Sequence, residues 1–164
     1  VYKRQVLAFA IGIPVGTLAA SKHNTMLDRA LMIPAISFVS LPSFLLAAIL
    51  ITVIGFWLDL LPVALWDGTA YYIMPAICLG MRPVGIIARL TRTSVLDVIR
   101  SDYVRTARAK GLEEKKVLFK HVLKNSLIPV LTYSGPLVAA TLSGSFVIEH
   151  IFNIPGLGKH FILT

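Results

Sequence analysis

The side chains that could perform enzymatic chemistry are few in this sequence, and none forms a recognised pattern. No pair among the histidines has the spacing of a metal site; they are His23, His121, His150 and His160. The lone cysteine, Cys78, excludes a disulfide within the sequence given and a cysteine-based metal cluster. A Ser–His–Asp set can be assembled from Ser126, His121 and Asp102, but nothing in their spacing supports it. We therefore predict no catalytic residue, no metal and no cofactor bound by this chain.

The most informative pattern lies in residues 101–125, which read as two short amphipathic helices joined at a glycine. Ser101 or Asp102 can cap a first helix, and Gly111 follows it where helices often end in a left-handed residue. A second helix is predicted to begin with two acids and end with three basic residues, in keeping with its dipole: Glu113, Glu114, Lys120, His121 and Lys124. Such an exposed helix–glycine–helix unit suits the docking of another protein.

The segments that flank this unit predict a membrane protein. Hydrophobic residues make up 56% of the chain and charged residues 15%, well below the share of about 25% usual in soluble domains. Eleven of the 16 Lys and Arg residues fall between Arg82 and Lys124, whereas residues 30–58 and 127–148 carry no charge. Basic segments beside apolar spans are typical of the cytoplasmic face of a membrane protein.

We predict an all-α integral membrane fold with about four transmembrane helices. The spans are residues 6–20, 30–58, 70–88 and 127–148. The basic segments 21–29 and 89–125 then lie inside, and the acidic loop 59–69 and the C-terminal segment lie outside; Lys3 and Arg4 do not fit this orientation.

In the first span, Gly12 and Gly16 have the spacing that lets helices approach closely. Val1 in place of Met, the absence of a signal-peptide pattern and the abrupt ends suggest an internal fragment.

The stretch RTARAKGLEEKKVLFKHVLKNSLIPVL resembles the cytoplasmic E-A-A…G signature of ABC-importer permeases, in the form found in oligopeptide, dipeptide, nickel and glutathione importers. Ala107 and Gly111 match the general signature, whereas Arg105 stands at its Glu position and Thr106 at its first Ala. The I-x-L-P ending is only partly kept, with the proline delayed to Pro129. MLDRALMI, PSF, MPA, ARLTR and FVIEHIFNIPGLG resemble the same branch in the same order, so the likeness covers almost the whole chain. The departures argue against a sugar or phosphate permease.

The resemblance implies a type I ABC-importer transmembrane domain, of which this chain holds the second to fifth of six spans. It implies a multi-pass location in the bacterial plasma (inner) membrane. The implied partners are a second homologous permease subunit, two ABC ATPase subunits that use ATP and Mg, an external substrate-binding protein and membrane lipid. The ATPase-coupling residues would be Arg105, Thr106, Ala107, Arg108, Ala109, Gly111 and Leu112. A slim helix carrying Ala107 and Ala109 would fit a groove of the ATPase. The sequence given contains no G-x-x-x-x-G-K-[ST] loop, in agreement with ATP being bound elsewhere.

Two charged residues next to apolar spans are further candidates. Arg82 lies within the third span and could contact a peptide carboxylate in the translocation path, form a structural pair or reach the membrane interface. Glu149, at the outer end of the last span, could act in an outer gate or simply mark the interface.

Two other classes of function remain as alternatives. A secondary transporter or channel would need ionisable residues or broken helices at mid-membrane, for which only Arg82 and Pro83 offer a signal, and it would leave the unit at Gly111 unexplained. A nucleic-acid binder could use the basic segment, but that segment holds just two aromatic residues, Tyr103 and Phe119, and its acidic pair would repel phosphate. We expect no nucleic-acid partner.

Overall fold

The computed structural model describes residues 2–63, 68–142 and 146–154, in which every regular element is a helix. The α-helices of the described residues are α1 (Tyr2–Ser21), α2 (Met26–Ser40), α3 (Ser43–Leu50), α4 (Ile73–Ile99), α5 (Asp102–Ala109), α6 (Glu114–Lys116), α7 (Lys124–Leu142) and α8 (Phe146–Ile151). Two π-helical segments, Ile51–Trp57 and Val117–Leu123, continue α3 and lead into α7, and a short 3-10 turn, Thr69–Tyr72, precedes α4. Residues 64–67 of the predicted outer loop and residues 155–164 of the C-terminal segment lie outside the described residues.

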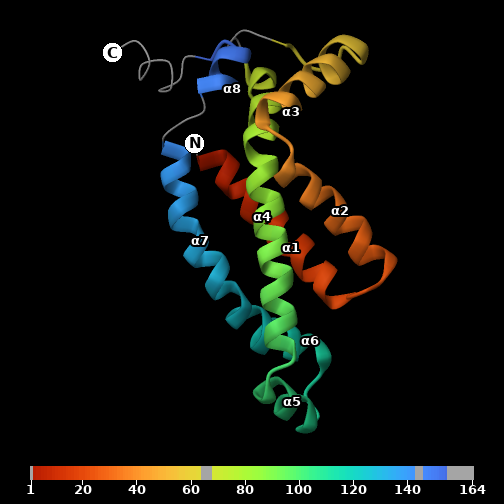
Figure 1. Ribbon diagram of the computed structural model, residues 1–164. Helices are drawn as coiled ribbons and strands as arrows, with labels where there is room; N and C mark the ends of the chain where they lie inside the picture. The colour runs from red at the N-terminus through yellow and green to blue at the C-terminus, as the bar shows by residue number, and fades with distance from the viewer. Residues whose placement is uncertain (1, 64–67, 143–145, 155–164) are drawn as a thin grey trace.

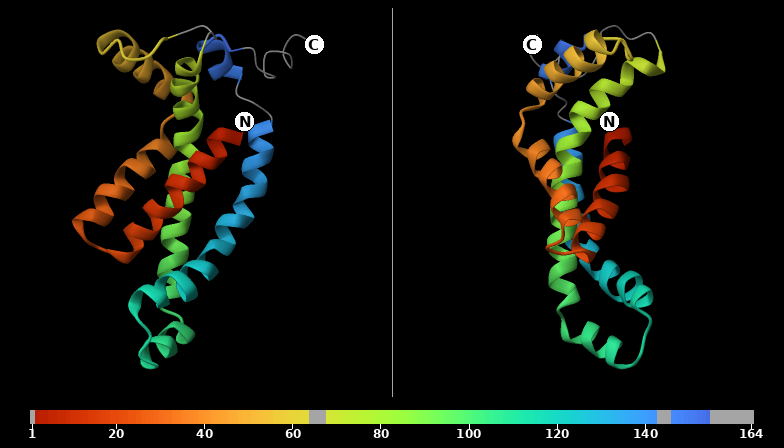
Figure 2. Two further views of the ribbon diagram at one scale, coloured as in Figure 1. Left: turned by 180° about the vertical axis from the view of Figure 1, so that it is seen from behind. Right: turned by 90° about the vertical axis from the view of Figure 1, so that its right-hand side faces the viewer.

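The molecule is organised around α4, a 27-residue helix about 40 Å long. It packs against α1, α2, α3 and α7. In Figure 1, α1 crosses behind α4 while α2 and α7 stand on either side, and the reversed view in Figure 2 brings α1 to the front. One end of α4 carries α5 and α6, and the other end lies beside α3 and α8. The basic segment 89–125 therefore extends to one end of the fold, and its predicted position on the inner side of the membrane stays a prediction.

Glycines permit the closest helix contacts on α4. A Cβ added to Gly12 would lie 2.7 Å from the side chain of Ile87, and one added to Gly16 would lie 2.7 Å from Cβ of Thr91. On α4 itself, a Cβ added to Gly85 would meet the backbone of α2 and the side chain of Val39. Small residues let helix backbones approach in this way, so the predicted role of Gly12 and Gly16 is confirmed.

The second predicted span, residues 30–58, is not one straight helix. α2 and the helix formed by α3 with its π-helical extension meet at an angle of 110°, across a break at Leu41 and Pro42. Leu41 is extended (ψ 128°), as residues before proline prefer, and Pro42 has no backbone N–H to continue the helix. Pro34, by contrast, is accommodated inside α2. Both prolines lie within the predicted span, and only Pro42 stands at its break.

Among the described residues, one helix, Thr69–Ile99, is by itself long and apolar enough to cross a membrane. The bent pair Met26–Ser40 and Ser43–Trp57 passes the same test as a unit, and the apolar helix Gln5–Ser21 is shorter than the test requires. The predicted third span, 70–88, thus belongs to a helix that continues for eleven more residues, to Ile99. The number of spans stays a prediction.

Candidate functional site

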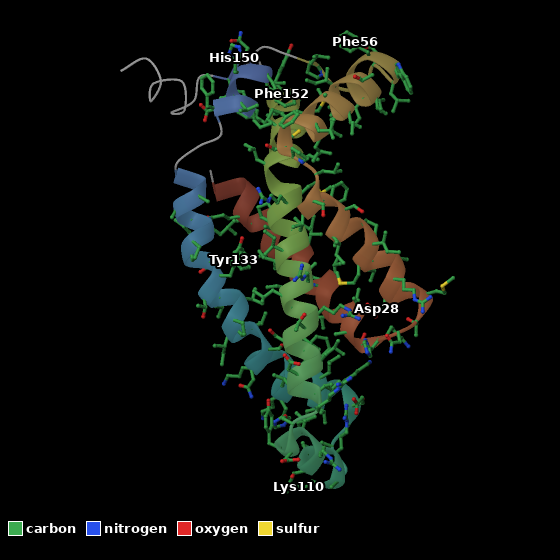
Figure 3. All side chains as sticks on the ribbon, viewed as in Figure 1. Asp28, Phe56, Lys110, Tyr133, His150 and Phe152 are labelled. Atoms are coloured by element: carbon green, nitrogen blue, oxygen red, sulfur yellow. The ribbon has the colours of Figure 1, made fainter. Side chains whose placement is uncertain are left out.

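The predicted docking unit is a compact projection at one end of α4. We call it the knob: α5, the turn at Gly111, α6 and the π-helical segment Val117–Leu123. Figure 3 shows Lys110 at its tip, at the end of the molecule farthest from His150 and Phe152. The knob is joined to the rest of the chain through α4 on one side and α7 on the other.

The end of α5 forms a complete Schellman motif. Gly111 has φ +76°, its N–H donates to the carbonyl of Arg108 at 2.9 Å, and the N–H of Leu112 donates to the carbonyl of Ala107 at 3.4 Å. Leu112 also packs against the buried cluster that contains Ala107. The predicted left-handed glycine is confirmed. Ser101 occupies the N-cap position, but its hydroxyl donates to the carbonyl of Val98 and makes no capping hydrogen bond.

Substitution of Gly111 with alanine tests this turn. An added Cβ would meet nothing within 4 Å, so the expected loss of about 1 kcal/mol arises from the left-handed backbone alone. Gly135 is the matched control, because its added Cβ also meets nothing and its φ is not left-handed. In thermal unfolding of the detergent-solubilised full-length protein, Gly111→Ala is expected to lower the midpoint and Gly135→Ala is not. Equal midpoints for the two variants would contradict the role assigned to Gly111.

The predicted second helix does not end at Lys124. α6, the π-helical segment and α7 follow one another without a break from Glu114 to Leu142. The argument that Lys120, His121 and Lys124 stabilise a helix C-terminus is therefore wrong, since these cations lie within a longer helix. The acidic start is as predicted, with Glu114 in the first turn.

A buried apolar cluster fixes the knob to the helices above it. Val104 and Ala107 of α5 pack with Val117 and Val122, and the cluster extends to Val95 of α4 and Ala20 of α1; the four named valines are 0% exposed. Ala107 is 6% exposed and faces this cluster. Ala107 was predicted, together with Ala109, to make a slim helix that fits a groove of the ATPase. In the structure its small side chain lets α5 lie close to its own domain, and its coupling role stays a prediction.

Polar contacts brace the same hairpin at the surface. The Arg108 guanidinium donates two hydrogen bonds to the Glu114 carboxylate, at 2.6 and 3.1 Å, and this pair lowers the pKa of Glu114. Both side chains are well exposed, so the pair contributes at most about 1 kcal/mol. On the other side, the Tyr103 hydroxyl donates to the carbonyl of His121 and accepts from the amide of Asn125. The shape of the knob is therefore set by its buried packing and supported at the surface by the Arg108–Glu114 pair and by the hydrogen bonds of Tyr103.

The outer face of α5 is exposed and mainly cationic. Arg105, Thr106, Ala109 and Lys110 are all exposed, whereas Leu112 is half-buried. Arg105 approaches Asp102 at 3.7 Å, but the two side chains are 76% and 98% exposed and the contact is weak. Of the seven predicted coupling residues, the structure thus places Arg105, Thr106, Arg108, Ala109 and Gly111 at the surface.

The other predicted residues lie far from the knob. Arg82 is exposed in the middle of α4 and forms no ion pair with another described residue. Glu149 is half-buried in α8, and one of its carboxylate oxygens is shielded from solvent without a hydrogen-bond partner among the described residues. The part of the chain described by the structure contains no group of three or more His, Cys, Asp or Glu placed to hold a metal.

Sequence reasoning missed the most ordered ionic contact of the described chain. Asp28 in the first turn of α2 accepts hydrogen bonds from Nε and Nη2 of Arg92, both at 2.7 Å, although the two residues are 64 positions apart. The Asp28 side chain is 4% exposed. The available signal was an acid placed within an otherwise basic turn, but no local rule identifies its partner.

Comparison with known proteins gives a consistent result. The family described as "Binding-protein-dependent transport system inner membrane component" matches residues 12–164. The chain is 46% identical over 157 residues to the dipeptide transport system permease protein DppB of Bacillus subtilis, covering 96% of this chain and 51% of that protein. It is 42% identical over 159 residues to the oligopeptide transport system permease protein OppB of Salmonella typhimurium, covering 96% and 52%. The chain therefore spans about half the length of the curated relatives it matches.

Proposed function

The chain belongs to the family of binding-protein-dependent transport system inner membrane components, and on that premise we propose that it forms part of the permease subunit of an ATP-driven peptide importer. In this proposal the helices around α4 contribute to the translocation path and the knob couples them to a separate ATPase. The chain itself is a transmembrane component and not an enzyme. The relatives' names refer to dipeptides and oligopeptides, and peptides are accordingly the substrate class that we propose.

The observation that carries the proposal is the construction of the knob. It projects beyond the end of α4, presents an exposed cationic face on α5, is fixed to α1 and α4 by a buried apolar cluster and continues directly into α7. A projection that is rigid inside and exposed outside transmits displacement instead of absorbing it. We propose that the face formed by Arg105, Thr106, Ala109 and Lys110 docks on the ATPase, with Ala107 as its internal anchor.

The proposed assembly contains partners that supply what this chain lacks. Two ATPase subunits bind ATP and Mg, a second homologous permease subunit completes the path, and an external protein delivers the substrate. The assembly lies in the plasma (inner) membrane of a bacterium, in contact with lipid. ATPase closure moves the knob, and the helices attached to it pass from an inward-open to an outward-open arrangement.

Reconstitution tests this function against a secondary transporter or channel. The full-length protein is placed in proteoliposomes with its companion permease, ATPases and binding protein, and uptake of a labelled dipeptide is measured. We expect uptake to require ATP and to persist when ion gradients are collapsed. Uptake that needs no ATPase but stops with an uncoupler would favour the secondary transporter instead.

We further propose that Arg82 lines the translocation path. It precedes Thr91, which faces α1, by nine positions, or about two and a half helical turns, so Arg82 lies on the opposite side of α4. It stands three residues beyond the centre of the predicted span 70–88, about 5 Å from mid-membrane. Because side chains tilt toward the N-terminus of their helix, Arg82 projects away from the nearer, inner interface, which disfavours snorkelling. A charge at this depth needs water, substrate or a protein partner.

Replacing Arg82 with alanine is expected to lower peptide uptake severalfold at normal expression, and Arg82→Lys is expected to retain more of it. The physical reason is the loss of the one cation near mid-membrane that can attract a peptide carboxylate. Uptake of a labelled peptide, normalised to membrane-inserted protein, is the measurement. Unchanged uptake by the alanine variant would contradict the assignment of Arg82 to the translocation path.

A further inference from the structure

The ion pair between Asp28 and Arg92 is well placed to act beyond simple stability. The planar guanidinium of Arg92 contacts both carboxylate oxygens at 2.7 Å, and the backbone N–H of Asn24 donates to the same carboxylate at 3.0 Å. His23 completes the surroundings, with Nδ1 3.1 Å from Nη2 of Arg92. Figure 3 shows Asp28 at the start of α2, beside α4. A two-point contact of this kind fixes both distance and direction.

The remaining contacts between α2 and α4 fix the distance between the helices more than their axial position. Near the ion pair they are formed by small or flexible apolar side chains: Met32 and Ala35 of α2 pack with Ala88, and Ala35 lies against Gly85. Farther along α2, Val39 lies against Gly85 and Phe38 packs on the cluster that contains Cys78, again without a polar or directional contact among the described residues. Smooth surfaces of packed helices slide past one another by small shear movements at little cost. The ion pair is therefore the contact that holds α2 and α4 in one register.

The knob is connected to α4 more directly than to α2. Its buried cluster includes Val95, one turn below Arg92, and Ala20 at the end of α1. The same cluster contains no residue of α2. A displacement of the knob consequently reaches α4 and the end of α1 by packing, and it reaches α2 through the turn after α1 and through Asp28.

The contacts beyond the far end of α2 show where a movement of α2 would be transmitted. α2 bends by 110° into α3, and Leu46 and Ala47 of α3 share a buried cluster with Cys78 of α4 and Ile148 of α8. α2 thus runs from the end of the molecule that carries the knob toward the opposite end (Figure 2). If α2 keeps register with α4, movement at the knob is passed along both helices to that opposite end.

We propose that Asp28 and Arg92 are positioning residues that make α2 move with α4 when the knob is displaced, so that ATP hydrolysis is converted into transport. The proposal rests on the importer function proposed above. It assigns the pair no contact with ATP or peptide. Loss of the pair leaves docking and hydrolysis in place and lets α2 lag behind α4.

The test is the number of peptides transported per ATP hydrolysed in proteoliposomes that hold the complete importer. Arg92→Lys keeps the charge but loses the fork, and the double variant Asp28→Asn/Arg92→Gln removes both charges without leaving one buried alone. For both we expect the ratio to fall about fivefold or more, with ATP hydrolysis retained. Arg29→Gln is the matched control, since it removes an exposed cation of α2 that forms no ion pair with another described residue.

A second readout separates coupling from folding. Spin labels at Ile33→Cys on α2 and Thr93→Cys on α4, in a Cys78→Ser background, report the distance between the helices; both sites are exposed. We expect this distance to be independent of nucleotide in the parent and to change with nucleotide in the two pair variants. Parental ratios and distances in both variants would overturn the inference. A parent complex without ATP-driven uptake would contradict the importer function itself.

Discussion

Replacement of Gly16 with leucine is expected to prevent stable packing of α1 on α4. A side chain at this position would overlap the backbone carbonyl of Ala88 and come within 2.7 Å of Cβ of Thr91. Backbone atoms of a long helix cannot give way as a flexible side chain can, so the helices must separate. We expect a loss of about 3 kcal/mol or more, measured as a collapse of the thermal midpoint and of protease resistance in the full-length protein.

Gly135→Leu is the control for this substitution, because a Cβ at Gly135 meets nothing within 4 Å. It adds the same side chain to another apolar helix without closing a helix contact. We expect it to leave the midpoint near the parental value. If Gly16→Leu were as stable as Gly135→Leu, the packing of α1 on α4 described above would be incorrect.

The second large effect is expected from Asp28→Asn. The substitution leaves the guanidinium of Arg92 beside a neutral amide in a place where the carboxylate was 4% exposed. The substitution removes the charged acceptor of the Arg92 hydrogen bonds, but the Arg92 side chain is 24% exposed and stays in contact with water, so we expect a loss of about 2–3 kcal/mol. The double variant Asp28→Asn/Arg92→Gln should be more stable than the single one, since neither charge remains. A single variant as stable as the parent would contradict the buried pair.

The pair also predicts a dependence of stability on pH. Asp28 lies outside the predicted spans, just before span 30–58. Hydrogen bonds from Arg92 lower its pKa from 3.8 to about 2, and the N–H of Asn24 and the charges of Arg92 and His23 contribute less. A carboxyl whose pKa is lowered by folding stabilises the fold above its unfolded pKa. This contribution, about 2 kcal/mol, is therefore present above pH 4 and is lost as the pH falls toward 2. Thermal midpoints measured between pH 2 and 6 should show that loss in the parent and not in Asp28→Asn.

Local chemistry made the knob predictable. The start of α5 near Ser101, its end at Lys110 and the left-handed Gly111 follow from residues that lie next to one another in the chain. The direction in which α5 faces did not follow, because it depends on the cluster formed with Val95 and Ala20 from distant helices. For that reason the sequence predicted the helix correctly but did not show that Ala107 faces the interior.

Features set by long-range packing could not be read from local patterns. The pairing of Asp28 with Arg92 joins residues 64 positions apart. The helix continues from Glu114 to Leu142, but basic residues within it resemble those of a helix C-terminus. The break at Pro42 could not be told from the sequence, because a second proline, Pro34, lies in the same predicted span and is accommodated inside α2. Composition identified the membrane character, since this depends on a sum over many residues.

Cysteine cross-linking tests the docking of the knob most directly. In full-length protein carrying Cys78→Ser, we place Ala109→Cys on the exposed face of α5 and, as a matched control, Ala107→Cys in its buried face. Each is combined with cysteines around the groove of the candidate ATPase. The predicted result is a disulfide from position 109 whose yield changes with ATP, and little or none from position 107. No cross-link from position 109 in intact, membrane-inserted protein would contradict the account.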